Sequence, residues 1–391
     1  MRKLKVVSVF SGAGGLDIGL ERADFETLAL CELVPSYAET LRRNSGVLLG
    51  DSHRYFTHAN IIQADIRSLS GSDLAAGVPI DCLVGGPPCQ AFSSSGKQLS
   101  VLDARGSLVA DFIRMVGEIR PASFIFENVR GIVTARDQTG KAGGVIRQVY
   151  AALEALGYSC RAGLLNAADY GAFQRRVRCF IIGVRSGTAP EFPLPSHAEG
   201  DAPQLFAQKW NTLGEFLAHS ADPDPNNYVY PTAALAAELA LLGDGNGLKS
   251  RGAAEPTRPG GHWGYRQGTF IADKSLPART VTGSSSQDWV RWEGRLRRLT
   301  LLEVKRLQGF PDDWVLCGNK ADAFKQIGNA VPTVFGQVLG EALLGHLKTV
   351  DGNKPARPLP FPKRFEGYIA YTERDHARNA SARKVHLQFG Q

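Results

Sequence analysis

The sequence lacks the features that mark membrane, secreted and zinc proteins. No apolar run approaches the ~18 residues that a membrane span needs, and the start, Met1 to Lys5, leads into a strand pattern rather than a signal-peptide core. The six cysteines form no Cys-x-x-Cys pair and the histidines do not cluster, which argues against a disulfide framework and against a metal site. We therefore expect a cytoplasmic protein with no bound metal and no membrane contact.

The chain is rich enough in apolar residues to form a large core. With 391 residues, 43% of them hydrophobic, it can form two domains. The net charge of +7 fits a polyanionic partner. The positive charge is concentrated, with ten Lys and Arg against four Asp and Glu in residues 249–298, and eight against four in residues 351–391.

Strand and helix patterns alternate through the first 185 residues. This alternation predicts an α/β fold with a Rossmann-like, doubly wound and mostly parallel sheet covered on both faces. Helical patterns return at 299–307 and 331–347. We expect strands at 6–10, 28–31, 61–62, 80–84, 124–126 and 179–184, and helices at 14–24, 37–43, 107–117 and 145–156.

The alternation stops after Arg185. Residues 186–295 are rich in Pro, Gly, Ser and Asn, which predicts a smaller, loop-rich domain. We therefore expect one domain made of residues 1–185 and 296–350, a second made of 186–295, and a basic extension at 351–391. Two interpretations of the extension stay open. It docks on the first domain through Phe361, Phe365, Tyr368 and Tyr371, or it contacts phosphates through Lys363, Arg364, Arg378, Arg383 and Lys384.

Residues 85–93 read Gly-Gly-Pro-Pro-Cys-Gln-Ala-Phe-Ser and follow a buried strand pattern. Pro87 and Pro88 fix φ and remove two backbone donors, so Cys89 cannot continue a helix or a central strand. A thiol on a stiff loop at the carboxyl end of a strand is placed as the nucleophile of an α/β enzyme. The alternative is a small buried hydrophobic residue, as most free cysteines are.

A glycine-rich turn, Phe10-Ser11-Gly12-Ala13-Gly14-Gly15-Leu16-Asp17, follows the first strand. Its glycines allow close approach of a ligand to the backbone. Asp17 stands at the third glycine of the dinucleotide fingerprint, which disfavours a pyrophosphate site. Glu32 ends the second strand about twenty residues on, where an acid binds ribose hydroxyls, or it is a solvated acid at a helix start. Asp65 and Ile66 follow the third strand and can hold an adenine.

Two further motifs carry charge. Glu127 and Asn128 follow three large apolar residues, so the carboxyl is expected to be half-buried and suited to share a proton with a ring nitrogen, or else to cap a turn at the surface. In Gln174-Arg175-Arg176-Val177-Arg178, an extended chain places Arg176 and Arg178 on one face. Both can then bind one anionic or carbonyl-bearing ligand, or they belong to a charged edge strand.

These motifs, in this order, resemble those of the DNA cytosine-5 methyltransferases of bacterial type. The resemblance runs from about Leu4 to Lys348 and is interrupted at 186–295, where this family has its target-recognition domain. Ser11 and Leu33 depart from the commonest residues of the family at their positions. The matching motifs are Phe-x-Gly-x-Gly-Gly at 10–15, Gly-Pro-Pro-Cys-Gln at 86–90, Glu-Asn-Val at 127–129, Gln-x-Arg-x-Arg at 174–178, the segment 298–311, and Gln-Ile-Gly-Asn-Ala-Val-Pro at 326–332.

The resemblance implies S-adenosylmethionine as cofactor, S-adenosylhomocysteine as product, and double-stranded DNA as substrate. It implies a covalent adduct between Cys89 and carbon 6 of a flipped cytosine, with Glu127 at N3 and Arg178 near O2. The implied catalytic residues are Cys89, Glu127, Asn128, Arg176 and Arg178. The implied cofactor-binding residues are Phe10, Gly12, Gly14, Gly15, Leu16, Glu32, Leu33, Asp65, Ile66, Pro88, Leu108, Asn329 and Ala330.

Three other functions are weaker. A tRNA cytosine methyltransferase of the same fold would carry a Cys-Phe-Thr element, whereas Cys179 and Phe180 are followed by Ile181. A nicotinamide oxidoreductase leaves Cys89 unexplained, and a catalytically silent DNA-binding subunit needs neither Cys89 nor Glu127. We expect a monomer associated with the nucleoid of a prokaryotic cell, with a cognate restriction endonuclease as a genetic rather than a physical partner.

Overall fold

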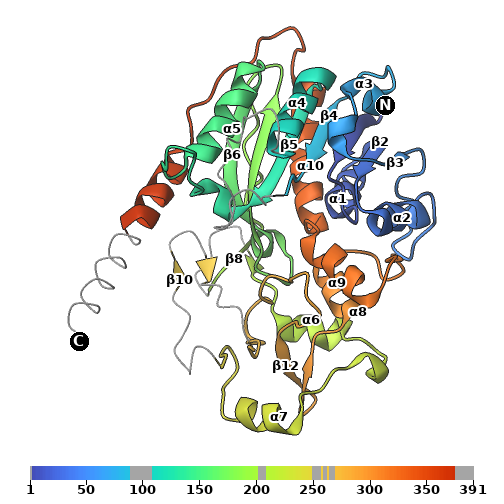
Figure 1. Cartoon of the computed structure of the whole chain (residues 1–391), viewed down its shortest axis with the longest axis vertical. Coiled ribbons are helices and arrows are strands. Elements are labelled where there is room, and N and C mark those ends of the chain that lie inside the picture. The colour runs from blue at the N-terminus through green and yellow to red at the C-terminus, as the bar shows by residue number, and fades with distance from the viewer. Residues whose placement is uncertain are drawn as a thin grey trace.

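The computed structural model describes residues 2–88, 108–200, 208–248, 257–258, 262–263 and 269–374. A seven-stranded sheet, in the order β3-β2-β1-β4-β5-β7-β6, forms one end of the molecule (Figure 1). Neighbouring strands are parallel from β3 to β5, and β7 is antiparallel to both β5 and β6, which confirms the mostly parallel sheet. The strands are β1 Leu4–Val9, β2 Phe25–Glu32, β3 Asn60–Gln63, β4 Cys82–Gly85, β5 Ser123–Val129, β6 Ser159–Asn166 and β7 Val177–Val184.

Helices cover both faces of this sheet. Successive side chains of a strand point to opposite faces, so Val6 of β1 belongs to the core under α1 and α10, whereas Val7 belongs to the core under α4 and α5. Figure 1 shows helices on both sides of the sheet. Helices α1 and α10 approach each other closely at Gly19, where a Cβ would lie only 2.0 Å from the carbonyl oxygen of Thr333. Only glycine fits at this position. The covering elements are α1 Gly15–Arg22, α2 Pro35–Asn44, η1 Ile66–Ser68, α3 Gly71–Ala75, α4 Leu108–Ile119, η3 Arg130–Val133, α5 Gly144–Ala155, η4 Ala167–Tyr170 and α10 Thr333–Thr349.

A second lobe contains α6, α7 and β12, which lie at the end of the molecule opposite the sheet (Figure 1). Phe216 and Val290 of this lobe share a hydrophobic core with Ile18 and Leu41 of the sheet domain, so the two lobes are packed together. Its elements are β8 His197–Ala198, β9 Gln208–Lys209, α6 Leu213–Ser220, η5 Pro225–Asn227, α7 Ala233–Ala240, β10 Thr257–Arg258, β11 His262–Trp263, β12 Trp289–Trp292 and β13 Arg295–Arg298, followed by α8 Leu301–Leu307 and α9 Lys320–Asn329.

The expected boundary between residues 295 and 296 falls inside a β-hairpin. Trp289 pairs with Arg298 and Trp292 with Arg295, so β12 and β13 form one antiparallel unit. The buried Arg297 of β13 donates to both carboxylate oxygens of Glu303, at 2.9 and 2.7 Å, and thereby fixes the hairpin to α8. The structural unit therefore continues to Arg298, and a division at 295 would separate paired strands.

The described part of the C-terminal extension is docked on the first domain. Residues 363–374 are helical. Phe365 and Ile369 are buried in the core that α4 and α5 share, and Phe361 contacts the ring of Tyr150 edge-on, with ring centroids 5.5 Å apart. The docking interpretation is therefore confirmed up to residue 374. Arg378, Arg383 and Lys384 lie outside the described residues.

The sequence patterns located most elements of the sheet domain but none of the short helices and strands within residues 186–295. Each expected strand overlaps an observed one, whereas β6, α3 and α9 were not expected. Helix α9 has the sequence Lys-Ala-Asp-Ala-Phe-Lys-Gln-Ile-Gly-Asn, which has too few apolar positions for a helical period to be recognised. Among the described residues, no helix combines the length and the apolar character that a bilayer crossing requires.

Candidate active site and cofactor cavity

A cavity of about 450 Å³ opens at the carboxyl ends of β1, β2, β4 and β5. The strand order reverses between β1 and β4, and open α/β sheets bind ligands at such a point. Its volume lies within the range of about 300–1,000 Å³ typical of cofactor sites. Twelve of the thirteen residues predicted to bind the cofactor line it, namely Phe10, Gly12, Gly15, Leu16, Glu32, Leu33, Asp65, Ile66, Pro88, Leu108, Asn329 and Ala330.

Gly14, the thirteenth predicted residue, is not among those that line the cavity. It has φ of 86°, in the left-handed region that favours glycine, and it is the N-cap of α1. A Cβ at this position would also lie 3.0 Å from a side-chain carbon of Leu41. Gly14 therefore shapes the turn rather than lining the site. Gly15 is required for close packing, since a Cβ there would lie 2.3 Å from the carbonyl oxygen of Val331.

Glu32 joins the glycine-rich turn to the end of β2. It is only 8% exposed, and its two oxygens accept hydrogen bonds from the backbone amides of Gly12 and Val34, each at 2.8 Å. This position excludes a solvated acid at a helix start. An ionised carboxylate accepts about four hydrogen bonds, so Glu32 retains acceptor capacity for ribose hydroxyls.

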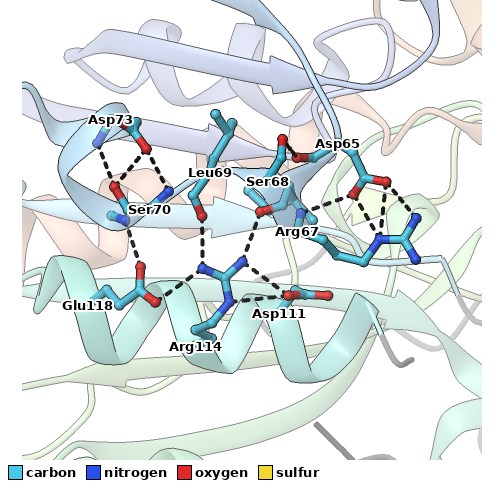
Figure 2. A network of polar contacts seen from close by, with 11 residues as sticks. Asp65, Arg67, Ser68, Leu69, Ser70, Asp73, Asp111, Arg114 and Glu118 are labelled. Carbon is cyan, nitrogen blue, oxygen red and sulfur yellow. Dashed lines mark hydrogen bonds and ion pairs between the residues drawn. The ribbon is translucent and has the colours of Figure 1, made fainter. Parts of the chain in front are cut away.

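Asp65 and Ile66 form another part of the wall, and a polar network fixes their position (Figure 2). The Arg67 side chain donates to Asp65, with Nε at 3.0 Å from Oδ1, and this pairing lowers the pKa of Asp65 to about 2. Arg114 of α4 donates to the carbonyl oxygens of Ile66 and Leu69 at 2.8 and 2.9 Å. Helix α4, whose first residue also lines the cavity, therefore holds the turn that carries Asp65 and Ile66.

Glu127 stands where the cofactor cavity meets the predicted catalytic residues. It is 8% exposed, lines the cavity and pairs with Arg178, whose Nε lies 3.0 Å from Oε1. Burial raises the pKa of Glu127, while the charges of Arg178 and Arg176 oppose that rise. Gly86 leaves room for the carboxylate, because a Cβ there would lie 2.6 Å from Oε2. The carboxyl is therefore buried more deeply than the half-buried position expected from the sequence, and it does not cap a turn at the surface.

Asn128 and Arg176 have roles in holding the chain together. The Asn128 side chain donates to the carbonyl oxygen of Pro87 at 3.0 Å. Arg176 is buried and donates to the carbonyl oxygens of Val281 and Gly328, both at 2.8 Å. Neither Arg176 nor Arg178 is among the cavity-lining residues, although the charges of both act on Glu127. Cys89, the predicted nucleophile, lies outside the described residues.

Within the described ranges, no three His, Cys, Asp or Glu residues gather as a metal site would need.

Several cavity residues were not predicted from the sequence. The signal for most of the unpredicted residues was adjacency to a motif, since they flank the strand ends or belong to the segment 326–332. They are Ser8, Val9, Ser11, Asp17, Cys31, Val34, Tyr37, Ala64, Gly85, Gly86, Gln326 and Val331. Glu127 also lines the cavity, but it was predicted as a catalytic residue.

Comparison with known proteins agrees with this geometry. The chain matches the family described as C-5 cytosine-specific DNA methylase over residues 4–345. It is 32% identical over 352 residues to the type II methyltransferase M1.HphI of Haemophilus parahaemolyticus, with 87% of each chain covered. It is 31% identical over 392 residues to the type II methyltransferase M.SacI of Streptomyces achromogenes, with 91% of this chain and 96% of that one covered.

Solved structures show the same fold. A DNA modification methyltransferase encoded within an E. coli prophage aligns with a TM-score of 0.58 at 22% identity, covering 88% of this chain and 100% of that one. A Spodoptera frugiperda DNMT2 mutant aligns with a TM-score of 0.61 at 16% identity, with the same coverage. The family match over most of the chain, with a relative above 30% identity, shows that this protein belongs to the C-5 cytosine-specific DNA methylases.

Proposed function

We propose that this DNA cytosine-5 methyltransferase binds S-adenosylmethionine in the cavity and methylates cytosines flipped out of duplex DNA at a specific sequence. The observation that carries the proposal is the continuity of the site. One cavity is lined by the glycine-rich turn, by Glu32 and by Asp65, and the same cavity reaches Glu127 and Pro88, next to Cys89 in the chain. A cofactor bound there would therefore lie beside the predicted catalytic residues.

The residues present fit this cofactor. Glycines at 12, 15 and 86 bring backbone to the cavity, and Asp17 contributes a buried carboxylate oxygen with no hydrogen-bond partner among the described residues. Asp65 and Ile66 would hold the adenine, and Glu32 the ribose hydroxyls. When bound, S-adenosylmethionine supplies an electrophilic methyl group.

The protein's own residues would activate the cytosine. The Cys89 thiolate adds to carbon 6, and the electrons of the 5,6 double bond make carbon 5 nucleophilic. Glu127 would stabilise the proton or hydrogen bond at N3, and Arg178 holds the Glu127 carboxylate in place. After carbon 5 has received the methyl group, its proton leaves and the carbon–sulfur bond breaks. These atoms are not reachable inside a duplex, so the base must first leave the stack.

The adduct can be tested directly. DNA with 5-fluorocytosine at the target position lacks the proton whose loss releases the enzyme, so the wild-type protein should form a complex that survives denaturing electrophoresis. Cys89→Ala should form none, and its turnover should fall below about a hundredth of wild type. Cys317→Ala, which changes a partly exposed cysteine outside the cavity, is the control and should behave like wild type. A trapped Cys89→Ala complex would refute the covalent role of Cys89.

The biological setting follows from the relatives. Both curated relatives described above are named type II methyltransferases, which supports a partnership with a cognate restriction endonuclease at the level of the genes. The segment Cys179-Phe180-Ile181 is fully buried in β7 and belongs to the core, so it offers no side chain to a tRNA substrate. Bisulfite sequencing of DNA from cells that express the protein would identify the methylated sequence.

A further inference from the structure

We infer that the Asp17 carboxylate binds the α-ammonium group of S-adenosylmethionine, as a positioning residue for the amino-acid part of the cofactor. Asp17 lies in the first turn of α1, is 1% exposed and lines the cofactor cavity. Its Oδ1 has no hydrogen-bond partner among the described residues. The Ser8 hydroxyl at the end of β1 acts on the carboxyl and lowers its pKa.

A buried carboxylate oxygen without a partner is costly and needs a physical reason. Leaving such an acceptor unpaired forfeits its hydration without a compensating bond, and the cost is greatest for a charged group. Burial raises the pKa of Asp17 to about 7, and the negative charge of Glu21 one turn later in α1 adds to the rise. Glu32 of β2 and Glu127 of β5 also line this cavity, and neither can supply the positive charge that would pair with an ionised Asp17 carboxylate.

The chemistry of the cofactor selects the group that meets this oxygen. S-adenosylmethionine has two cationic centres, and the sulfonium has no N–H or O–H to donate, whereas the ammonium has three N–H donors. Glu32 and Asp65 are already assigned to the ribose and the adenine. The amino-acid part then falls to the wall formed by α1 and residues 329–331, where Asp17 lies. The same charge would repel a pyrophosphate, which explains why an acid occupies the third-glycine position.

This inference rests on the proposed cofactor, and one titration experiment separates the two. Wild type, Asp17→Asn and Glu21→Gln are titrated calorimetrically with S-adenosylmethionine and with 5′-methylthioadenosine, which has the adenosine part but no ammonium. Glu21 is the matched control, because it is a largely buried acid of the same helix that accepts from the backbone amides of Thr27 and Phe56 and does not line the cavity. Binding of 5′-methylthioadenosine also reports that each variant has kept a folded cavity.

Asp17→Asn should bind S-adenosylmethionine about ten- to a hundredfold more weakly than wild type, the range for a hydrogen bond to a charged group. Its affinity for 5′-methylthioadenosine should stay within about threefold, and Glu21→Gln should keep the ratio of the two affinities within about threefold of wild type at pH 7.5, where Asp17 is mostly ionised in both. In wild type this ratio should also fall as the pH drops from 7.5 to 5.5, because protonated Asp17 cannot pair with a cation, and Asp17→Asn should lose that dependence.

Two results would overturn the inference. If Asp17→Asn binds S-adenosylmethionine as wild type does, or loses both ligands equally, then Asp17 has only a structural role. If wild type binds no S-adenosylmethionine, the cofactor assignment fails and this inference fails with it.

Discussion

Glu127→Gln is the substitution that tests the catalytic end of the site most directly. Glutamine keeps the size of the side chain, so its carbonyl oxygen can still accept from Arg178 Nε, which lies 3.0 Å from Oε1 in the wild type. Its amide can donate a hydrogen bond to N3 but cannot transfer a proton. The loss is therefore that of general acid catalysis, about 10²–10⁴-fold in the rate of methyl transfer, equivalent to about 3–5 kcal/mol in the barrier.

The rate is best measured under single turnover, with radiolabelled methyl groups and saturating DNA. Cofactor and DNA affinities are measured separately, because a positioning defect would weaken binding whereas a lost proton donor would not. Glu26→Gln is the control, since Glu26 is also a strand acid paired with a cation, Lys5 at 3.3 Å, and does not line the cavity. A Glu127→Gln enzyme within about fivefold of the wild-type rate would refute the role of Glu127 at N3.

Two further predictions concern the docked C-terminal extension and the segment 186–298. Phe365→Ala should lower the free energy of unfolding by about 3–5 kcal/mol, because Phe365 is buried under the docked helix, whereas exposed Lys363→Ala should change it little, as urea denaturation would show. If Phe365→Ala and Lys363→Ala had the same free energy of unfolding, the helix would not be docked in solution. Exchanging residues 186–298 for the segment of a relative with a known site should transfer that site to the chimera, whereas a junction at 295 should give an unstable protein. A chimera joined at 298 that folds and keeps the original site would place base recognition outside this segment.

Twelve of the thirteen residues predicted to bind a cofactor line one cavity, because their positions are fixed by local backbone requirements. A glycine-rich turn after a buried strand and an acid at the end of the next strand have few alternative placements in a parallel sheet. In the structure, the backbone amide of Gly12 accordingly donates to the Glu32 carboxylate at 2.8 Å. Gly14 does not line the cavity and adopts the left-handed conformation of the turn, and sequence does not distinguish a glycine that touches a ligand from one that allows this conformation.

Long-range partners were not predictable in the same way. Arg176 precedes β7, and its guanidinium group donates to the carbonyl oxygens of Val281 and Gly328, over a hundred residues away in sequence. Some of the positive charge in residues 249–298 contributes to the fold itself. Arg297 is buried against Glu303, and Arg298 lies with its guanidinium carbon 4.1 Å from the centre of the Trp289 ring. Composition counts such charges equally, whether they face solvent or hold a fold together.

Asn128 shows how the structure relates the acid to the nucleophile. β4 and β5 are paired in parallel, with Gly85 opposite Phe126, so the residues that follow both strands leave the sheet side by side. Glu127 faces the cavity, and the next residue, Asn128, donates to the carbonyl oxygen of Pro87, two residues before Cys89. Because Pro87 and Pro88 restrict φ, this hydrogen bond fixes where the chain that carries Cys89 leaves β4. Asn128 therefore holds the start of the segment that leads to Cys89, the predicted nucleophile, beside the Glu127 carboxylate.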